Sequence, residues 1–283
     1  MINKNIVWVA SYPKSGNTWV RSILSSLLFS DDGIFNFDLL LHIDQFDNEK
    51  NFQFVKEMNE EDYSNLNKME IVSKYWDLSQ KKIGSVKDYF FFKTHSANYS
   101  YKNINYVNID HALGCIYLLR DPRDVAISYS KHINQPINEV IKMMIQSNQQ
   151  IYNPYKTIGV ILSRWDFHVV SWIKLNKPKL IIKYEDLLDN TEEMITKIIK
   201  FLRESLDINF TSHDKKIQNI IDSTSFDKLK ENETNEGFGE SSKKSPFFRV
   251  GQKMQWKKIL DKNQILKIEE NFNKTMRDFG YLE

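Results

Sequence analysis

The feature that most constrains the fold is a short run of β-branched and aromatic residues, Asn5 to Ala10, that leads directly into the segment SYPKSGNTW (residues 11–19). The run predicts a buried strand, and apolar residues at helical spacing from Asn17 to Phe29 predict a helix. Gly16 permits the backbone angles of a tight turn between them, and Lys14 adds a positive charge. Because backbone N–H groups are exposed at a helix N-terminus, this arrangement predicts a cradle for an anion.

Further strands and helices alternate along the chain. Strands are expected at Tyr89 to Lys93, Cys115 to Leu119 and Leu180 to Tyr184, and helices at Pro122 to His132, Ile158 to Leu175 and Thr191 to Glu204. This alternation predicts an α/β fold with a central parallel β-sheet flanked by helices. In such sheets ligands bind beyond the carboxyl ends of the strands, so the residues after each strand are the first candidates for a site.

The composition limits the class of protein. The 283 residues, 41% hydrophobic and 27% charged, suit a globular chain, and we expect one domain over residues 1–283. A net charge of +2 is too balanced for a protein that coats nucleic acid or anionic membrane. The single cysteine, Cys115, excludes an intrachain disulfide framework, and no apolar run approaches the roughly 18 residues of a membrane span. We therefore expect a soluble, cytoplasmic protein with neither nucleic-acid partners nor membrane insertion.

Lys93 and His95 stand two residues apart at the end of a predicted strand, so their side chains should leave the same face. A base of pKa about 6.5 beside a lysine is suited to removing a proton from a hydroxyl or an amine. A lone histidine at such a place is also compatible with simple packing, which is the interpretation that we give His168.

Two further segments indicate anion binding. Asp121 followed by Pro122 predicts a helix start, which places Arg120 at the carboxyl end of a strand with its planar fork available to a phosphate. Ser128 either reaches the same anion or faces solvent. Arg249, two residues before Gly251, offers another cation beside an approachable backbone. Three anion sites without an acidic metal cluster predict a ligand with more than one phosphate and no required metal.

Two regions of unusual composition remain. Residues 31–70 contain eleven Asp or Glu against three Lys, a charge of minus eight. This region predicts either a solvated acidic face or a funnel for a cationic small molecule. Residues 231–246 are polar and aperiodic, with two glycines, and predict a mobile surface loop that acts as a lid over residues 231–248.

Together these motifs resemble sulfotransferases that use 3′-phosphoadenosine 5′-phosphosulfate. SYPKSGNTW is similar to their 5′-phosphosulfate loop, LLRDPRDVAISYS to their 3′-phosphate segment, FFKTH to the strand with their catalytic histidine, and RVGQKMQWK to their C-terminal signature. The resemblance covers most of the chain except residues 31–84, where acceptor sites of this family vary. It implies the P-loop-kinase-like architecture of that family.

The resemblance also implies roles for individual residues. His95 would be the general base, with Lys93 and Lys14 as the other catalytic residues. The implied donor-binding residues are Lys14, Ser15, Gly16, Asn17, Thr18, Trp19, Arg120, Ser128, Tyr184, Thr224, Phe226, Arg249 and Gly251. Lys14 to Thr18 would hold the 5′-phosphate and the sulfuryl group, and Arg120, Ser128, Arg249 and the Gly251 backbone the 3′-phosphate. Trp19 and Phe226 would stack on the adenine, with Tyr184 and Thr224 at its edge.

The chain departs from the family pattern near its C-terminus. Val250 replaces a lysine of the signature, Met254 a glycine and Gln255 an aspartate, so one positive charge near the 3′-phosphate is lost. The dimer motif of the animal cytosolic members has no match, which leaves the oligomeric state open.

The expected function is sulfuryl transfer to a hydroxyl or amine of a small-molecule or glycosidic acceptor, among which a cationic metabolite is one candidate. Two alternatives stay open. A nucleotide kinase-like phosphotransferase would share the sheet, but Lys14 precedes Gly16, unlike the order in the G-x-x-x-x-G-K-[ST] loop. A non-catalytic nucleotide- or RNA-binding protein would use the same anion sites without chemistry.

Overall fold

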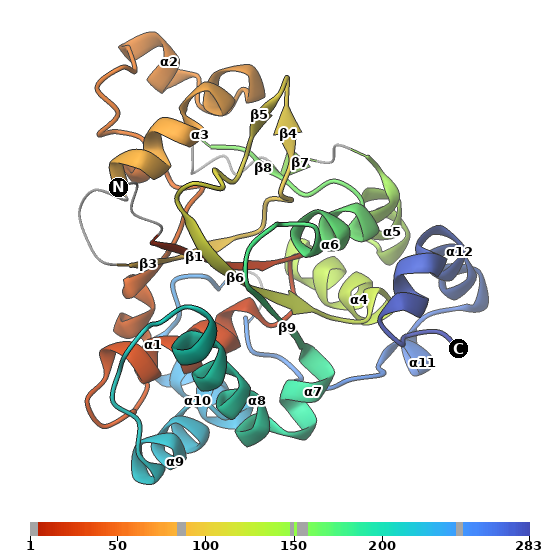
Figure 1. Ribbon diagram of the computed structural model, residues 1–283. Helices are drawn as coiled ribbons and strands as arrows, with labels where there is room; N and C mark the ends of the chain where they lie inside the picture. Colours follow the sequence, from red (N-terminus) through yellow and green to blue (C-terminus); the bar gives the residue numbers. More distant parts are fainter. Residues whose placement is uncertain (1–4, 84–88, 148–149, 152–157, 242–245) are drawn as a thin grey trace. The chain divides into compact units, whose positions relative to one another are not determined.

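The computed structural model describes residues 5–83, 89–147, 150–151, 158–241 and 246–283, and Figure 1 labels most of their helices and strands. Five strands form one sheet in the order β2-β3-β1-β6-β9. β1 (Ile6–Ser11) pairs in parallel with β3 (Phe90–Thr94). The other strands of this sheet are β2 (Ile43–Gln45), β6 (Ala112–Leu119) and β9 (Lys179–Lys183). The predicted α/β class, a central parallel sheet flanked by helices, is confirmed.

The chain divides into two compact units, each assembled from three segments. The first unit comprises Met1–Tyr12, Asp44–Tyr117 and Met143–Ile181, and the second comprises Pro13–Ile43, Leu118–Lys142 and Ile182–Glu283. The strands β1, β6 and β9 end at or near the points where the chain passes from the first unit to the second. The segments that follow these strands therefore belong to the second unit. A single domain over residues 1–283 stays a prediction.

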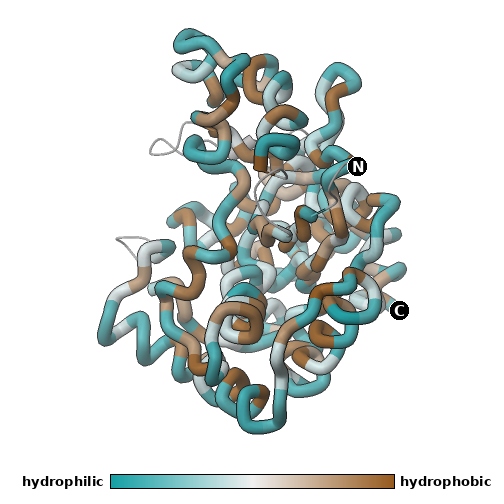
Figure 2. The backbone as a smooth tube through the Cα atoms, turned by 60° about the vertical axis from the view of Figure 1, so that its left-hand side comes forward, coloured by the Kyte–Doolittle hydropathy of each residue, from teal (hydrophilic) through white to brown (hydrophobic). Residues whose placement is uncertain are grey.

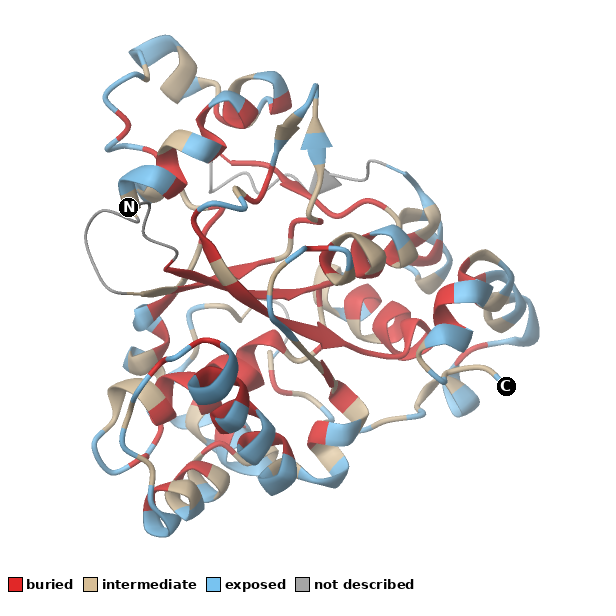
Figure 3. Ribbon diagram, viewed as in Figure 1, coloured by how far each residue is buried: buried red, intermediate tan, exposed pale blue. Residues whose placement is uncertain are grey.

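The first unit is built around the middle of the sheet. β1 is buried along its whole length, as Figure 3 shows in red, which is expected of an inner strand of a parallel sheet. The ring of Trp8 lies 5.0 Å from that of Phe46, 5.7 Å from Tyr106 and 5.9 Å from Trp172, measured between centroids. Other elements of this unit are η2 (Glu49–Asn51), α2 (Glu60–Ser64), α3 (Met69–Ile83), β4 (Ser100–Tyr101), β5 (Ile104–Asn105), β7 (Gln150–Ile151), β8 (Val160–Ile161) and α6 (Trp165–Ile173).

The second unit is mainly helical. Its elements include α1 (Asn17–Phe29), η1 (Phe37–His42), α4 (Pro122–Ile133), α7 (Tyr184–Asp189), α8 (Thr191–Lys200), η3 (Phe201–Ser205), α9 (Asp214–Ser223), α10 (Phe226–Glu236), α11 (Trp256–Ile259) and α12 (Lys262–Asp278), and α5 (Ile137–Ile145) starts in this unit. Hydrophobic and hydrophilic residues alternate along the helical turns in Figure 2. α12, for example, buries Ile268, Phe272 and Met276 at a spacing of four, so one face packs inward.

The structure corrects two of the predicted elements. The helix expected over Ile158 to Leu175 starts only at Trp165, because β-branched Val160 and Ile161 form the strand β8 and Ser163 has a positive φ of 56°. The expected loop over residues 231–248 is wrong for residues 231–236, which continue α10. Two positions of that helix four residues apart, Leu229 and Glu233, are buried. Residues 242–245 of the predicted lid lie outside the described residues.

Within the described ranges, no helix combines the length and the hydrophobicity needed to cross a membrane.

Candidate active site

The turn after β1 has the backbone that the sequence predicts. Gly16 has a φ of 96°, and a Cβ atom at this position would lie 2.9 Å from the Tyr184 ring, so both the backbone and the packing require glycine. Trp19, on the first turn of α1, packs edge-on against the same ring, at 6.0 Å between centroids. Tyr184 therefore braces the turn; it begins α7 and does not end β9 as predicted.

The side chains of the turn include unpaired and paired donors. Ser15 Oγ is buried without a hydrogen-bond partner among the described residues. Thr18 Oγ1 donates to Glu240 Oε2 at 3.2 Å, and Glu240 also forms an ion pair with Arg21 at 2.6 Å. The Lys14 ammonium lies 3.8 Å from the centroid of the Phe247 ring. Asn17 is buried at the start of α1. An acidic residue of the predicted lid segment is thus in contact with the turn.

Arg120 directly follows β6 and is only 5% exposed. Its Nη1 group donates to the Lys14 carbonyl at 3.0 Å, and its Nη2 group donates to the Gln252 carbonyl at 3.1 Å. Its guanidinium carbon lies 4.1 Å from the centroid of the Tyr184 ring. Its Nε is buried and has no hydrogen-bond partner among the described residues. Arg120 therefore connects three segments of the second unit and keeps one unused donor.

Arg249 adds a second cation. Burial lowers the pKa of Arg249, and the charge of Arg120 lowers it further, so the two guanidinium groups are close enough to repel each other. Two residues later, Gly251 has a φ of 60°, and a Cβ atom there would lie 2.5 Å from the Phe226 ring. An anion placed near these arginines would relieve their repulsion.

The other predicted donor-binding residues also lie in the second unit. Phe226 is half-buried and packs at 6.0 Å from Phe248. Thr224 is buried, and its hydroxyl donates to the Ile220 carbonyl at 2.7 Å. Ser128 is half-buried on α4. The structure thus links Lys14, Gly16, Trp19, Arg120 and Tyr184 by direct contacts or through shared partners, whereas Ser128 has no described contact with them.

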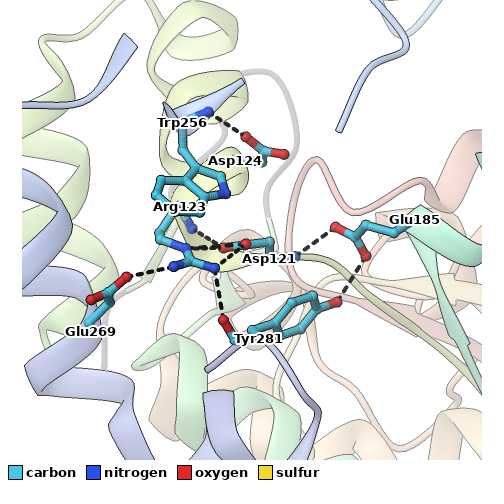
Figure 4. A network of polar contacts seen from close by, with 7 residues as sticks. All are labelled: Asp121, Arg123, Asp124, Glu185, Trp256, Glu269 and Tyr281. Carbon is cyan, nitrogen blue, oxygen red and sulfur yellow. Dashed lines mark hydrogen bonds and ion pairs between the residues drawn. The ribbon is translucent and has the colours of Figure 1, made fainter. Parts of the chain in front are cut away.

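A polar network that the sequence did not reveal includes Asp121 and Glu185, the chain neighbours of Arg120 and Tyr184 (Figure 4). These two neighbours are joined, because the Asp121 N–H donates to Glu185 Oε1 at 3.1 Å. Tyr281 donates its hydroxyl to Glu185 at 3.0 Å and accepts at its carbonyl from Arg123 at 2.9 Å. Arg123 in turn forms an ion pair with Asp121 at 2.7 Å and with Glu269 at 2.5 Å. Only the role of Asp121 as a helix cap was visible in the sequence.

Lys93 and His95 lie in the first unit. Lys93 is buried at the end of β3, and its carbonyl accepts from the Phe46 N–H at 2.9 Å. The Nδ1 atom of His95 lies 2.8 Å from the carbonyl oxygen of Ser11. Because a carbonyl oxygen only accepts, we assign the proton of neutral His95 to Nδ1, which leaves Nε2 with the basic lone pair. His95 can therefore act as a base through Nε2.

The backbone of His95 is held by a second histidine. His168 Nε2 lies 3.1 Å from the carbonyl oxygen of His95 and must donate to it, so His168 Nδ1 accepts from Tyr117 Oη at 2.8 Å. Burial lowers the pKa of His168 to about 4, so it is neutral at physiological pH. The prediction that His168 is buried by packing is confirmed, and its contact with His95 is an addition.

We expect His168 to make the stability of the fold depend on pH. Between about pH 6.5 and pH 4 the unfolded chain binds a proton at this residue and the folded chain does not, so stability falls as the pH falls through this window. The contribution is on the order of 3 kcal/mol. Urea unfolding of His168→Gln at several pH values should show a flatter profile than the wild type. The same substitution at exposed His42 is the control, and equal slopes for His168→Gln and the wild type would contradict the assignment.

Comparisons with known proteins agree with this geometry. The model of the sulfotransferase domain family matches residues 4–280. The chain is 24% identical to the amine sulfotransferase of Oryctolagus cuniculus, over 98% of this chain and 83% of that protein. It is 28% identical to sulfotransferase 1A1 of Rattus norvegicus, over 61% of this chain and 59% of that protein, so this match spans less than two thirds of the relative.

Solved structures show the same fold. A retinol dehydratase in complex with androsterone and the inactive cofactor PAP superposes with a TM-score of 0.63 at 21% identity, covering 98% of this chain and 82% of that one. Mouse sulfotransferase SULT7A1 complexed with PAP gives a TM-score of 0.61 at 21% identity, with 98% and 86% covered. The resemblance seen in the sequence is confirmed, and the chain belongs to the sulfotransferase domain family.

Proposed function

We propose that this protein transfers a sulfuryl group from 3′-phosphoadenosine 5′-phosphosulfate to a hydroxyl or amine of a small acceptor. The observation that carries the proposal is the buried guanidinium of Arg120, which has an unused Nε donor and a second guanidinium nearby. Two cations that repel each other favour a ligand with a localised double negative charge, such as a phosphate monoester. Two of the similar solved structures, the retinol dehydratase and mouse SULT7A1, are complexes with PAP.

The residues of the second unit fit such a donor. Arg120 and Arg249 would hold the 3′-phosphate, and Gly251, where a Cβ atom would collide with the Phe226 ring, keeps its backbone free of a side chain. The turn with Lys14, the buried Ser15 hydroxyl and the α1 N-terminus would hold the 5′-phosphate and sulfuryl group. The contact between Glu240 and Thr18 would have to yield to the donor, because a carboxylate and a phosphate repel each other.

When bound, the donor supplies a sulfuryl group whose bond to the 5′-phosphate oxygen breaks as a bond to the acceptor forms. His95 would take the acceptor proton at Nε2 while Nδ1 stays bonded to the Ser11 carbonyl. Lys14 would stabilise the negative charge that develops on the departing phosphate oxygen, and Lys93 would hold the sulfuryl oxygens. The work of these residues is positioning and charge stabilisation, as in phosphoryl transfer.

Our proposal for the acceptor rests on the acidic region. Part of its charge is used within the fold, because Asp44 pairs with Lys50, Glu49 accepts from Tyr63 and Asp62 accepts from Tyr75. Other carboxylates are exposed: Asp31, Asp32 and Asp38 in the second unit, and Glu57, Glu60, Glu61 and Glu70 in the first. Exposed acidic residues attract a cation, and one similar protein is named an amine sulfotransferase. We therefore propose a cationic amine as acceptor.

A test of the donor uses Arg249→Gln. Because the substitution removes a repulsive charge, it should leave the stability of the unliganded protein unchanged or slightly higher. Affinity for 3′-phosphoadenosine 5′-phosphate should fall by about 10- to 100-fold, since a charge-assisted contact is lost. Adenosine 5′-phosphate, which lacks the 3′-phosphate, should bind equally to variant and wild type. Thermal-shift titrations measure the stability of the unliganded proteins and their affinities for both nucleotides.

Exposed Arg277→Gln is the control for the change of net charge. At about 100 times its dissociation constant, the bisphosphate should stabilise the wild type by roughly 2.7 kcal/mol. If ATP with Mg²⁺ stabilises the wild type and the bisphosphate does not, the donor assignment is wrong and the kinase alternative replaces it.

A test of the base uses His95→Gln. Turnover with 3′-phosphoadenosine 5′-phosphosulfate should fall by roughly 100-fold or more, because the proton acceptor is lost, while the thermal shift with the bisphosphate stays as in the wild type. His42→Gln is the matched control. Retention of more than about a tenth of the wild-type activity would remove His95 from this role.

The acceptor class is tested with a panel at equal concentrations, comprising a primary amine, a phenol and a neutral sugar. We expect the amine to have the highest kcat/KM, and we expect its advantage to shrink as added salt screens the acidic residues. Efficient turnover of the phenol or sugar together with none of the amine would refute a cationic acceptor but leave sulfuryl transfer intact.

A further inference from the structure

A buried carboxylate lies beside the strand that carries His95. Asp47 is 2% exposed, and its acceptor atoms are engaged by three hydroxyl groups. Thr94 Oγ1 donates to Oδ2 at 2.8 Å, Ser96 Oγ donates to Oδ1 at 3.3 Å, and Tyr106 Oη donates to both oxygens at 2.9 and 3.0 Å. Thr94 and Ser96 are the two chain neighbours of His95, so one carboxylate holds the residue on each side of it.

The segment containing Asp47 also holds the preceding residues of β3. The Phe46 N–H donates to the Lys93 carbonyl at 2.9 Å, and the Ser96 N–H donates to Thr94 Oγ1 at 2.9 Å. His95 itself contacts the carbonyl of Ser11 and the ring of His168. Every residue from Lys93 to Ser96 therefore has at least one polar contact within the fold. Small shifts of this stretch would therefore have to break several hydrogen bonds.

Stability of the fold does not account for a charged group at this place. No ion pair of Asp47 is found among the described residues, and burial raises its pKa to about 6 despite the hydrogen bonds from Thr94, Tyr106 and Ser96. When folding raises the pKa of a carboxyl group, the fold loses stability as the pH rises through that pKa. The ionised form of Asp47 is therefore unfavourable for folding at neutral pH. The charge itself therefore does not stabilise the fold, whereas only a carboxylate accepts from all three hydroxyls at once.

We propose that Asp47 is a positioning residue for His95, because its carboxylate fixes the hydroxyl groups on both sides of that histidine and so keeps Nδ1 on the Ser11 carbonyl and the lone pair on Nε2. The assignment of His95 as a base rests on the proposed function. The positioning itself is a property of the fold and has a readout independent of activity.

The experiment compares Asp47→Asn, Thr94→Val and Thr94→Ser with the wild type. Asp47→Asn replaces one acceptor oxygen by a donor, and Thr94→Val removes the hydroxyl while keeping the shape. Both should lower kcat by about tenfold or more and leave both KM values within about twofold, because misplacement of the base affects the reacting geometry and not binding. Thr94→Ser keeps the hydroxyl and should retain most of the wild-type kcat.

Asp62→Asn is the matched control, because Asp62 is an aspartate of the same unit that accepts from a tyrosine, Tyr75, at 2.6 Å. It should leave kcat unchanged. Denaturation of each variant at the assay pH identifies any variant that is only partly folded. The wild type against Thr94→Val then decides the question, because threonine and valine have the same shape and differ only by a hydroxyl in place of a methyl group.

¹⁵N NMR of histidine-labelled protein gives the second readout, with the His95 signals assigned from His95→Gln. In the wild type we expect the tautomer with the proton on Nδ1, and in Asp47→Asn a mixture with the Nε2–H form. Wild-type kcat and an unchanged tautomer in Asp47→Asn and Thr94→Val would overturn the inference. If the wild type itself lacks sulfuryl transfer, the proposed function fails and the tautomer still decides the positioning.

Discussion

The buried guanidinium of Arg120 connects the three chain segments of the second unit. It donates to the carbonyls of Lys14 and Gln252 and lies over the Tyr184 ring, so segments distant in the sequence share one partner. A buried cation needs compensation, and backbone carbonyls provide only part of it. The positive charge of Arg249 repels that of Arg120, so the two cations need further negative charge to compensate them. The proposed function uses the same two cations, which would favour a doubly charged anion.

Around this cation, the polar groups are arranged as supports. Asp121 and Glu185 follow Arg120 and Tyr184 in the chain and are joined to each other, and Tyr281 and Arg123 extend the network to α12 through Glu269 (Figure 4). The first unit uses the same principle for His95, whose side chain and carbonyl are held by Ser11 and His168. In both units the candidate site residues are held by neighbours that do not themselves need to contact a ligand.

The sequence predicted what local patterns determine. The strand before Ser11, the glycine turn, the Asp121 helix start and Arg120 at a strand end all follow from short-range signals, and the structure confirms them. Asp47, Glu185 and Tyr281 could not be predicted, because their roles come from contacts with residues 47 to 158 positions away. Asp47 in particular lies in the acidic region of residues 31–70, whose composition predicts an exposed surface. Only the tertiary packing shows that Asp47 is buried. The helix expected from Ile158 failed because β-branched residues suit either a helix interior or a strand.

The proposed binding of a phosphate monoester by Arg120 and Arg249 can be tested with ³¹P NMR of bound 3′-phosphoadenosine 5′-phosphate. The second pKa of a phosphate monoester is about 6, and adjacent guanidinium groups stabilise the dianion. We expect the titration midpoint of the 3′-phosphate to fall by about one unit or more on binding. A nucleotide that binds with the 3′-phosphate titrating as it does in free solution, or that does not bind at all, would contradict this account.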